Sequence, residues 1–220
     1  MCSSDLLLRE TDLHIVGEFF LEIRHHLAAI KGTKLEEVEE VFSHPQALMQ
    51  SHAALKELKV KINSYLNTAL AAKFVHNQQK KNIAALCTKL AAEINDLTIL
   101  KYDLQESKSN KTTFVALAKN IEELPVETNH KITTLLFTAR NIPASIYKCL
   151  GGFATNNINI IKLESYIPGG ISKEAQFFIS FEGDTDDVKV KCALDELGFY
   201  TKSIKLLGVY DAEPARKKNK

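Results

Sequence analysis

A short polar run near residue 45 contains residue types that could bind a small anion. Ser43 and His44 precede Pro45, and the carboxamides of Gln46 and Gln50 follow closely. Serine is a common helix N-cap and proline fits a first turn, so the run predicts a helix that begins after Ser43 and continues along an apolar stripe to residue 58. The free amides of such a turn favour a carboxylate or phosphate. Many helix starts look the same, so by itself the run is more often an ordinary cap.

The composition is that of a globular protein with one or two domains. Among 220 residues, 45% are hydrophobic and 25% are charged, which is enough for real cores. The 28 basic and 27 acidic residues leave a net charge of +1. Such a balance gives no global field that would attract nucleic acid or a membrane surface, so we expect neither partner.

The reactive side chains give no sign of a metal or a cofactor. The cysteines (Cys2, Cys87, Cys149 and Cys192) are far apart and lack metal-ligand spacing. His25 and His26 are adjacent, so they lie on opposite faces of a strand and cannot chelate together; we expect both to be structural. No glycine-rich loop suggests a nucleotide, and no segment reads as a membrane span or a secretory start. We expect a cytoplasmic protein without cofactor or metal.

The N-terminal half alternates strand-like and helical runs, which predicts an α/β layer architecture. The expected strands are 14–16, 19–30, 60–62, 98–102 and 113–117. Three helices are expected: one that follows Ser43, one with Thr68 as its N-cap, and one over residues 83–94.

The C-terminal half predicts a separate domain after a polar linker over residues 120–130. Its order is β-α-β-β-α-β, which is ferredoxin-like. The elements are 131–138, 143–155, 158–165, 174–182, 186–197 and 199–207. Pro143 is expected to start the first helix, Asp184 or Thr185 to cap the second, and Pro168-Gly169-Gly170 to form the hairpin turn. Residues 211–220 read as a solvated basic tail.

Several ordered motifs together resemble the prephenate dehydratase family. Residues 43–50 are similar to its SHPQAL-x-Q segment, 68–72 to its TA-x-AA helix start, 110–114 to its N-x-T-R-F motif, and 164–166 to its ESRP motif in an alphaproteobacterial variant. The resemblance implies an α/β fold: a partial two-lobed, periplasmic-binding-protein-like catalytic domain over 7–119, and a ferredoxin-like ACT regulatory domain over 131–210.

The same resemblance implies that part of the family pattern is missing. The family's first lobe carries GP-x-G-[TS] and P-x-ENS segments, and neither occurs here. Residues 1–6 match what a sequencing adaptor encodes, so we expect a non-native leader followed by an N-terminally truncated member that is inactive alone.

The resemblance implies conversion of prephenate to phenylpyruvate, water and carbon dioxide in phenylalanine biosynthesis. The Thr112 hydroxyl would donate to the departing hydroxyl group, Ser43 and Gln50 would bind substrate oxygens or brace the cleft, and His44 would give a supporting hydrogen bond. Asn110 belongs to the same motif, and Phe114 would pack against the substrate ring or fill the core. Thr113 stands where the family has Arg, and Thr cannot pair with a carboxylate in the forked manner of Arg. We therefore expect weaker substrate binding unless another cation compensates.

The ACT resemblance implies feedback binding of L-phenylalanine between subunits of a homodimer or homotetramer. The residues implied are Ala144, Ser145, Ile146, Glu164 and Ser165, with Tyr166 in place of the motif's Arg. Two alternatives remain open: an arogenate dehydratase, and a non-catalytic amino-acid-binding regulatory protein.

Overall fold

The computed structural model describes residues 8–107, 110–120, 130–167, 174–214 and 216. The chain forms two compact units, and one is inserted into the other in sequence. The inserted unit is Leu21–Thr112, and the flanking unit joins Met1–Phe20 to Thr113–Lys220. Among the described residues, no helix is long and apolar enough to cross a membrane.

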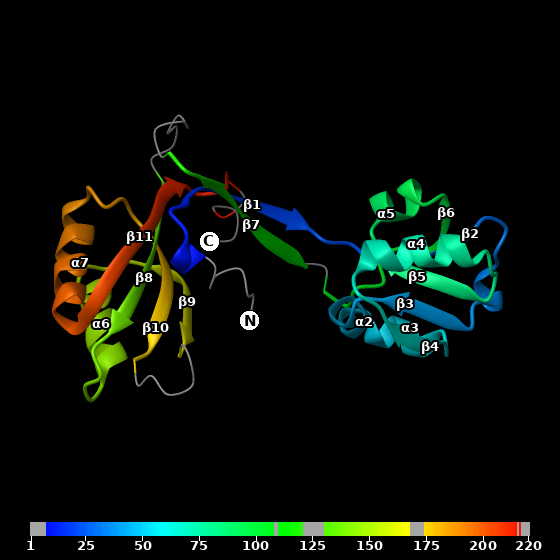
Figure 1. Ribbon diagram of the computed structural model, residues 1–220, viewed down its shortest axis with the longest axis horizontal. Helices are drawn as coiled ribbons and strands as arrows, with labels where there is room; N and C mark the ends of the chain where they lie inside the picture. The colour runs from blue at the N-terminus through cyan, green and yellow to red at the C-terminus, as the bar shows by residue number, and fades with distance from the viewer. Residues whose placement is uncertain (1–7, 108–109, 121–129, 168–173, 215, 217–220) are drawn as a thin grey trace. The chain divides into compact units, whose positions relative to one another are not determined.

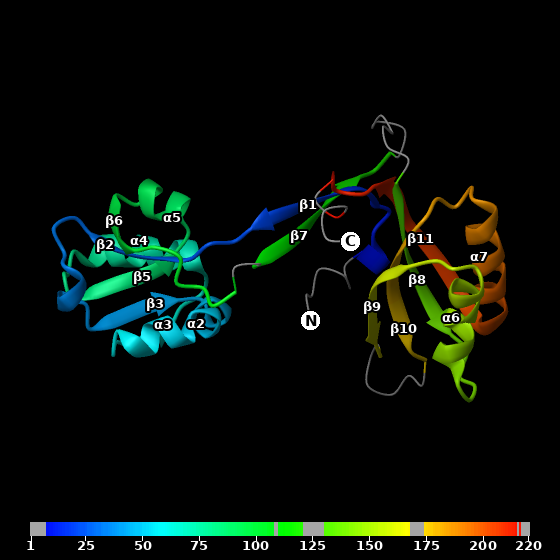
Figure 2. The same ribbon diagram turned by 180° about the vertical axis from the view of Figure 1, so that it is seen from behind.

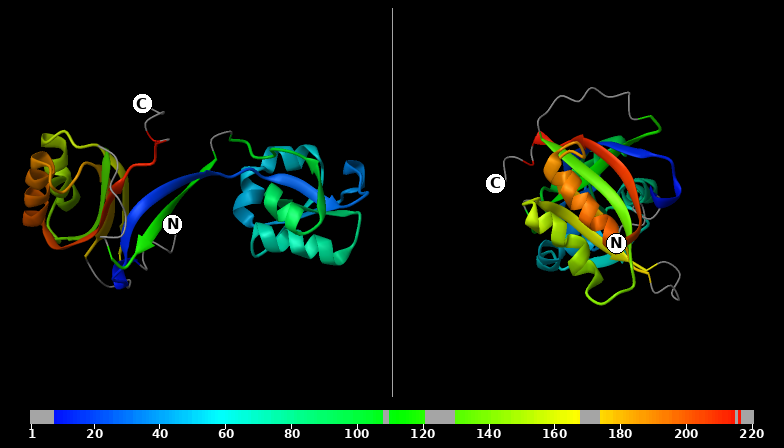
Figure 3. Two further views of the ribbon diagram at one scale, coloured as in Figure 1. Left: turned by 90° about the horizontal axis from the view of Figure 1, so that it is seen from above. Right: turned by 90° about the vertical axis from the view of Figure 1, so that its left-hand side faces the viewer.

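The flanking unit contains the predicted ferredoxin-like order, which the structure confirms. The elements are β8 (Lys131–Ala139), α6 (Ser145–Thr155), β9 (Ile160–Tyr166), β10 (Gln176–Glu182), α7 (Val188–Tyr200) and β11 (Thr201–Asp211). The sheet order is β11-β8-β10-β9, with antiparallel neighbours. Helices α6 and α7 pack side by side on one face of the sheet (Figures 1 and 3). Aromatic side chains of Phe137, Phe153 and Phe181 belong to the core between these helices and the sheet.

Some helix starts in this unit differ from the predictions. Helix α6 begins at Ser145 with Ala144 at its N-cap, so Pro143 lies before the helix rather than in its first turn. Helix α7 has Asp187 at its N-cap. The Asp184 carboxylate instead accepts a hydrogen bond from the Asp186 amide (2.9 Å), so it shapes the preceding turn. The predicted turn at 168–170 and most of the linker lie outside the described residues.

Strands β1 (His14–Glu22) and β7 (Lys111–Ala118) form a separate two-stranded sheet. A short 3-10 turn, η1 (Leu8–Glu10), precedes it. Ile15 is buried in a cluster with Phe178 and Leu207 of the sheet face that carries no helix. Gly208 permits this approach, because a Cβ there would collide with the carbonyl oxygen of Ile15.

The inserted unit is a three-layer α/β/α body. Its strands are β2 (His26–Ile30), β3 (Glu40–Ser43), β4 (Lys61–Ser64), β5 (Ile83–Cys87) and β6 (Leu97–Lys101), in the order β4-β3-β5-β2-β6. Its helices are η2 (Leu35–Glu37), α2 (Pro45–Gln50), α3 (His52–Glu57), α4 (Thr68–Gln78) and α5 (Lys89–Ile94). Helices α2 and α3 cover one face of the sheet, and α4 and α5 cover the other (Figure 2). Alternate strand residues serve the two layers, as Ala84 and Ala85 illustrate.

Three predictions for the inserted unit are wrong in detail. Residues 83–94 are not one helix: β5 is a fully buried strand, and Thr88 caps the short helix α5 that follows. The expected strand over 19–30 is interrupted between β1 and β2. The helix expected from Ser43 to residue 58 is two helices that meet at the buried Ser51.

Candidate functional site

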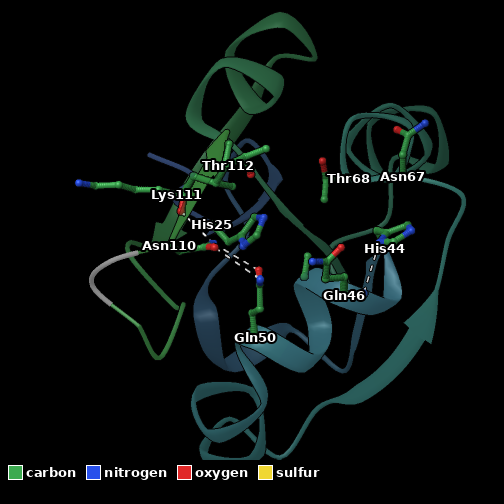
Figure 4. A pocket seen from close by; sticks show the side chains of 11 residues that line it. His25, His44, Gln46, Gln50, Asn67, Thr68, Asn110, Lys111 and Thr112 are labelled. Atoms are coloured by element: carbon green, nitrogen blue, oxygen red, sulfur yellow. Dashed lines mark hydrogen bonds between the residues drawn. The ribbon is translucent and has the colours of Figure 1, made fainter. Parts of the chain in front are cut away.

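The inserted unit contains a cavity of about 470 Å³ whose lining is mostly polar. Figure 4 shows the side chains that surround it. The lining residues are Ile23, His25, His44, Gln46, Ala47, Gln50, Asn67, Thr68, Asn110, Lys111 and Thr112. The structure therefore brings together four of the predicted site residues, Gln50, His44, Asn110 and Thr112, although they come from distant segments.

Two carboxamides form a reciprocal pair at one side of the cavity. Gln50 Nε2 lies 3.5 Å from Asn110 Oδ1, and Asn110 Nδ2 lies 3.3 Å from Gln50 Oε1 (Figure 4). Asn110 also exchanges bonds with Ile23: its side chain donates to the Ile23 carbonyl (3.2 Å), and its carbonyl accepts from the Ile23 amide (2.8 Å). These bonds fix the end of α2 and the start of β7 against one another.

Helix starts form another side of the cavity. His44 rather than Ser43 is the N-cap of α2, and its Nδ1 accepts the Gln46 amide (3.3 Å). Asn67 rather than Thr68 is the N-cap of α4, and its Oδ1 accepts the Leu70 amide (2.7 Å). The positive end of the eleven-residue helix α4 thus borders the cavity at Asn67 and Thr68. Lys111 also belongs to the lining, but its side chain extends away from the space between Thr112 and Gln50 (Figure 4).

Thr112 presents a hydroxyl group to this polar cavity. The residue is exposed, and its hydroxyl has no hydrogen-bond partner among the described residues. A free hydroxyl can donate one hydrogen bond and accept two, so it can serve a bound molecule.

The structure moves two predicted residues away from the cavity lining. Ser43 is fully buried, so a substrate cannot reach it, and its Oγ donates to the Leu86 carbonyl (2.6 Å) and ties β3 to β5. Phe114 is 50% exposed and does not line the cavity, so the expectation that it fills a core is wrong.

Thr113 lines a different cavity, one of about 360 Å³ in the flanking unit. The carboxylate beside it is that of Glu18, and Arg216 already pairs with this carboxylate at 2.6 Å. Position 113 therefore does not border the cavity around Thr112, and the cation at Glu18 is Arg216 of the C-terminal segment.

His25 is a cavity residue that sequence reasoning assigned to a structural role. Its neighbour His26 fits that role, since its Nδ1 accepts the Asp103 amide (3.0 Å) and its ring meets Tyr102 edge-on. The ring of His25 lies in the cavity lining, and its Nδ1 is buried without a partner. The prediction that the two histidines lie on opposite faces of one strand is wrong, because β2 begins at His26 and His25 lies in the connection before it.

Six other lining residues were missing from the predicted site, of which four are polar: Gln46, Asn67, Thr68 and Lys111. Gln46, Thr68 and Lys111 lie within motifs that the sequence already singles out, and Asn67 directly precedes one. Their nearness to predicted helix starts and to Thr112 is the signal that could have added them.

The residues expected to bind phenylalanine lie on two elements of the flanking unit. Ala144, Ser145 and Ile146 surround the start of α6, and Ala144 has φ 57°, in the left-handed region that favours glycine. Glu164 and Ser165 lie on β9, an edge strand, where Glu164 pairs with Lys162 at 3.4 Å.

Comparison with known proteins gives a consistent family. Residues 2–122 match the family described as prephenate dehydratase. The chain is 37% identical over 96% of its length to a bifunctional N-acyl-homoserine lactone acylase/prephenate dehydratase of Komagataeibacter europaeus, and it spans 75% of that protein. It is 34% identical over 95% of its length to arogenate dehydratase 2 of Petunia hybrida, and it spans 56% of that protein.

Solved structures share the fold. A prephenate dehydratase from Arthrobacter aurescens, solved in complex with L-Phe, superposes with a TM-score of 0.84 at 23% identity. The superposition covers 95% of this chain and 69% of that one.

Proposed function

The chain belongs to the prephenate dehydratase family, and on this premise we propose that its cavity binds prephenate and promotes conversion to phenylpyruvate. In that reaction the bond between the ring and its carboxylate breaks, and the electron pair completes the aromatic ring. The ring hydroxyl leaves as water after taking up a proton. The protein needs to hold a dianion, orient it and donate a hydrogen bond to the leaving oxygen.

The observation that supports this proposal most directly is the free hydroxyl of Thr112 in an anion-favouring cavity. The start of α4 favours negative charge there. The Gln50 amide gives one hydrogen to Asn110 and has a second N–H that can orient a carboxylate. Thr112 is a poor free acid, so its role is that of a hydrogen-bond donor to the developing hydroxide.

We expect this chain alone to bind prephenate and to turn it over slowly or not at all. The Thr112 side chain is exposed, and water competes for hydrogen bonds that catalysis needs in a dry site. Prephenate binding is measured by titration calorimetry, and phenylpyruvate is measured by chromatography after long incubation. Thr112→Val should reduce any turnover by about 100-fold while Thr112→Ser retains part of it. Absence of both binding and turnover in the wild-type chain would contradict the proposal.

Arogenate is the second candidate substrate, since a relative 34% identical to this chain is named an arogenate dehydratase. Arogenate carries an ammonium group where prephenate carries a keto oxygen. None of the described residues that line the cavity is acidic, which favours the keto acid. Titration of the same protein with both compounds decides, and tighter binding of arogenate would reverse the assignment.

Acyl-homoserine lactone hydrolysis is less favoured, although a 37% identical relative is named for that activity. The cavity contains Thr68 and Thr112 with two imidazoles, but no hydrogen bond joins a threonine hydroxyl to His25 or His44 in the described structure. An activated hydroxyl nucleophile needs such a bond to its base. An acylase assay in parallel with the dehydratase assay tests this ranking.

We also propose that the flanking unit is an ACT regulatory domain that binds L-phenylalanine between subunits of a cytoplasmic homodimer or homotetramer. Its support is the ferredoxin-like order and the edge position of β9. The left-handed Ala144 carries a Cβ where a glycine backbone could approach a ligand closely. Ala144→Gly should therefore tighten phenylalanine binding, and Ala154→Gly, at an exposed position of α6, should leave binding unchanged. No phenylalanine binding by either wild type or Ala144→Gly would contradict the assignment, and sedimentation with and without phenylalanine tests the oligomer.

A further inference from the structure

The backbone of His25 is held from both sides by one neighbouring segment. Its amide donates to Gln105 Oε1 (3.0 Å), and its carbonyl accepts the Leu104 amide (2.9 Å). Leu104 is itself buried in the core beneath α2 and α3. The side chain of His25 therefore has a fixed starting point and cannot move far from the cavity.

The imidazole of His25 is buried but not satisfied. The residue is 5% exposed, and its Nδ1 has no hydrogen-bond partner in the described structure. A buried polar atom left unpaired costs roughly 1–3 kcal/mol. His26 next to it shows the ordinary solution, because its Nδ1 accepts the Asp103 amide.

The other ring nitrogen of His25 is the one that can meet a ligand. The ring lines the cavity, where Figure 4 shows it pointing into the space bordered by Gln46, Gln50 and Thr112. Since Nδ1 is buried, the edge of the ring that faces the cavity carries Nε2. No hydrogen bond within the described structure uses Nε2 either.

The protonation of the ring follows from its surroundings. Burial lowers the pKa of His25 below its ordinary value of 6.5, and neighbouring His26 lowers it further. The imidazole is thus neutral near pH 7 and carries one N–H. Buried unpaired N–H groups are rarer than buried unpaired acceptors, so the proton belongs on Nε2, where a ligand can accept it.

We propose that His25 is a substrate-binding residue whose Nε2–H donates a hydrogen bond to an oxygen of prephenate. This inference rests on the proposed function and adds a contact to it. A neutral donor suits this position, because it can bind a carboxylate or the ring hydroxyl without holding the leaving group as a tight ion pair. A merely space-filling histidine would be replaced by an apolar ring without loss of binding.

Substitutions at position 25 separate these two roles in the full chain. His25→Phe fills the volume and removes the unpaired Nδ1, so the variant should be at least as stable as wild type. It should bind prephenate at least about tenfold more weakly, as expected for a lost hydrogen bond to a charged group. His25→Gln places an amide N–H near the Nε2 position and should keep most of the affinity. His25→Asn reaches only the Nδ1 position and should resemble His25→Phe. His52→Gln, on the exposed start of α3, is the matched control.

The measurements are prephenate titration by calorimetry, thermal unfolding, and nitrogen-15 NMR of the histidine rings. In wild type, prephenate should shift the Nε2 resonance of His25 and leave that of His52 in place. Wild-type affinity in His25→Phe overturns the inference while the proposed function stands, provided that wild type binds prephenate. An unmoved His25 resonance at saturating prephenate overturns it as well, even if the Phe variant does not fold. A wild-type chain that does not bind prephenate overturns both proposals.

Discussion

The guanidinium of Arg216 binds the carboxylate of Glu18 through both oxygens. Arg216 Nε lies 2.9 Å from Oε1, and Nη2 lies 2.6 Å from Oε2. The Glu213 amide adds a third bond to Oε1 (3.1 Å), and the guanidinium stacks 4.9 Å from the ring centre of Phe20. Because the Glu18 side chain is 3% exposed, this pair fixes the C-terminal segment on β1.

Breaking this pair should destabilise the protein. Arg216→Ala leaves a buried carboxylate without its cation, and we expect a loss of about 2 kcal/mol in the free energy of unfolding, below the usual cost for a fully buried pair because the arginine is partly exposed. Urea denaturation measures it. Lys31→Ala, which breaks the exposed pair with Asp96, should change little.

The position of Thr113 permits a rescue of that variant. Thr113 lines the same cavity as Glu18 and Arg216, so Thr113→Arg in the Arg216→Ala background should restore part of the lost stability. If the double variant is no more stable than Arg216→Ala, position 113 does not reach the Glu18 carboxylate.

Ser43→Ala should affect stability rather than substrate binding. The substitution leaves the buried Leu86 carbonyl without the Ser43 Oγ donor, at a cost of roughly 1–2 kcal/mol. Calorimetric titration with prephenate should give the wild-type affinity, whereas Gln50→Ala should weaken it. Equal weakening by both substitutions would restore Ser43 as a direct ligand.

The adjacent glycines of α6 should respond differently to alanine. A Cβ at Gly151 meets nothing within 4 Å, so Gly151→Ala should stabilise the helix by about 1 kcal/mol. A Cβ at Gly152 would lie 3.0 Å from the backbone of Ala193 in α7. Gly152→Ala should therefore be the less stable of the two in thermal unfolding. Equal stabilities would mean that α7 moves aside at little cost.

Mild acid should destabilise the inserted unit. Burial lowers the pKa of both His25 and His26 below 6.5; Asp103 opposes this at His26, and Arg24 and Lys89 reinforce it. A lowered pKa means that the unfolded chain binds more protons, so the stability is fully present above pH 6.5 and falls as the pH drops through the folded-state pKa values. Urea denaturation across this range should show the fall, and His25→Gln combined with His26→Gln should flatten it. A wild-type profile as flat as that of the double variant would contradict the linkage.

The ferredoxin-like order could be predicted because each of its elements has its own periodicity. Helix α6 carries a single apolar stripe, and β10 is a short apolar run between polar residues, although its five inner positions are all buried. The run from Ile83 to Cys87 lies between two helical layers and is buried at every position. A strand of that kind has no alternation, so it could not be separated from the helix after it.

The site could be predicted as far as local sequence motifs reach. Thr112, Gln50, His44 and Asn110 stand in recognisable runs, and the structure brings them to one cavity. His25 depends on the segment at Leu104 and Gln105 that fixes its backbone, a contact nearly eighty residues away that no local pattern encodes. Ser43 and His44 differ by one position at the helix start, and such boundaries are the least certain part of a sequence-based assignment.

The insertion of residues 21–112 into the flanking unit sets an order of events during translation. The strand β1 leaves the ribosome early, but its neighbour β7 and the sheet face that buries Ile15 are synthesised only later. All strands of the inserted unit have been synthesised once the chain reaches residue 112. The inserted unit can therefore fold before β1 has a partner. Until the rest of the flanking unit is synthesised, the apolar side chains of β1 stay uncovered, so this segment is the part of the nascent chain most in need of a chaperone.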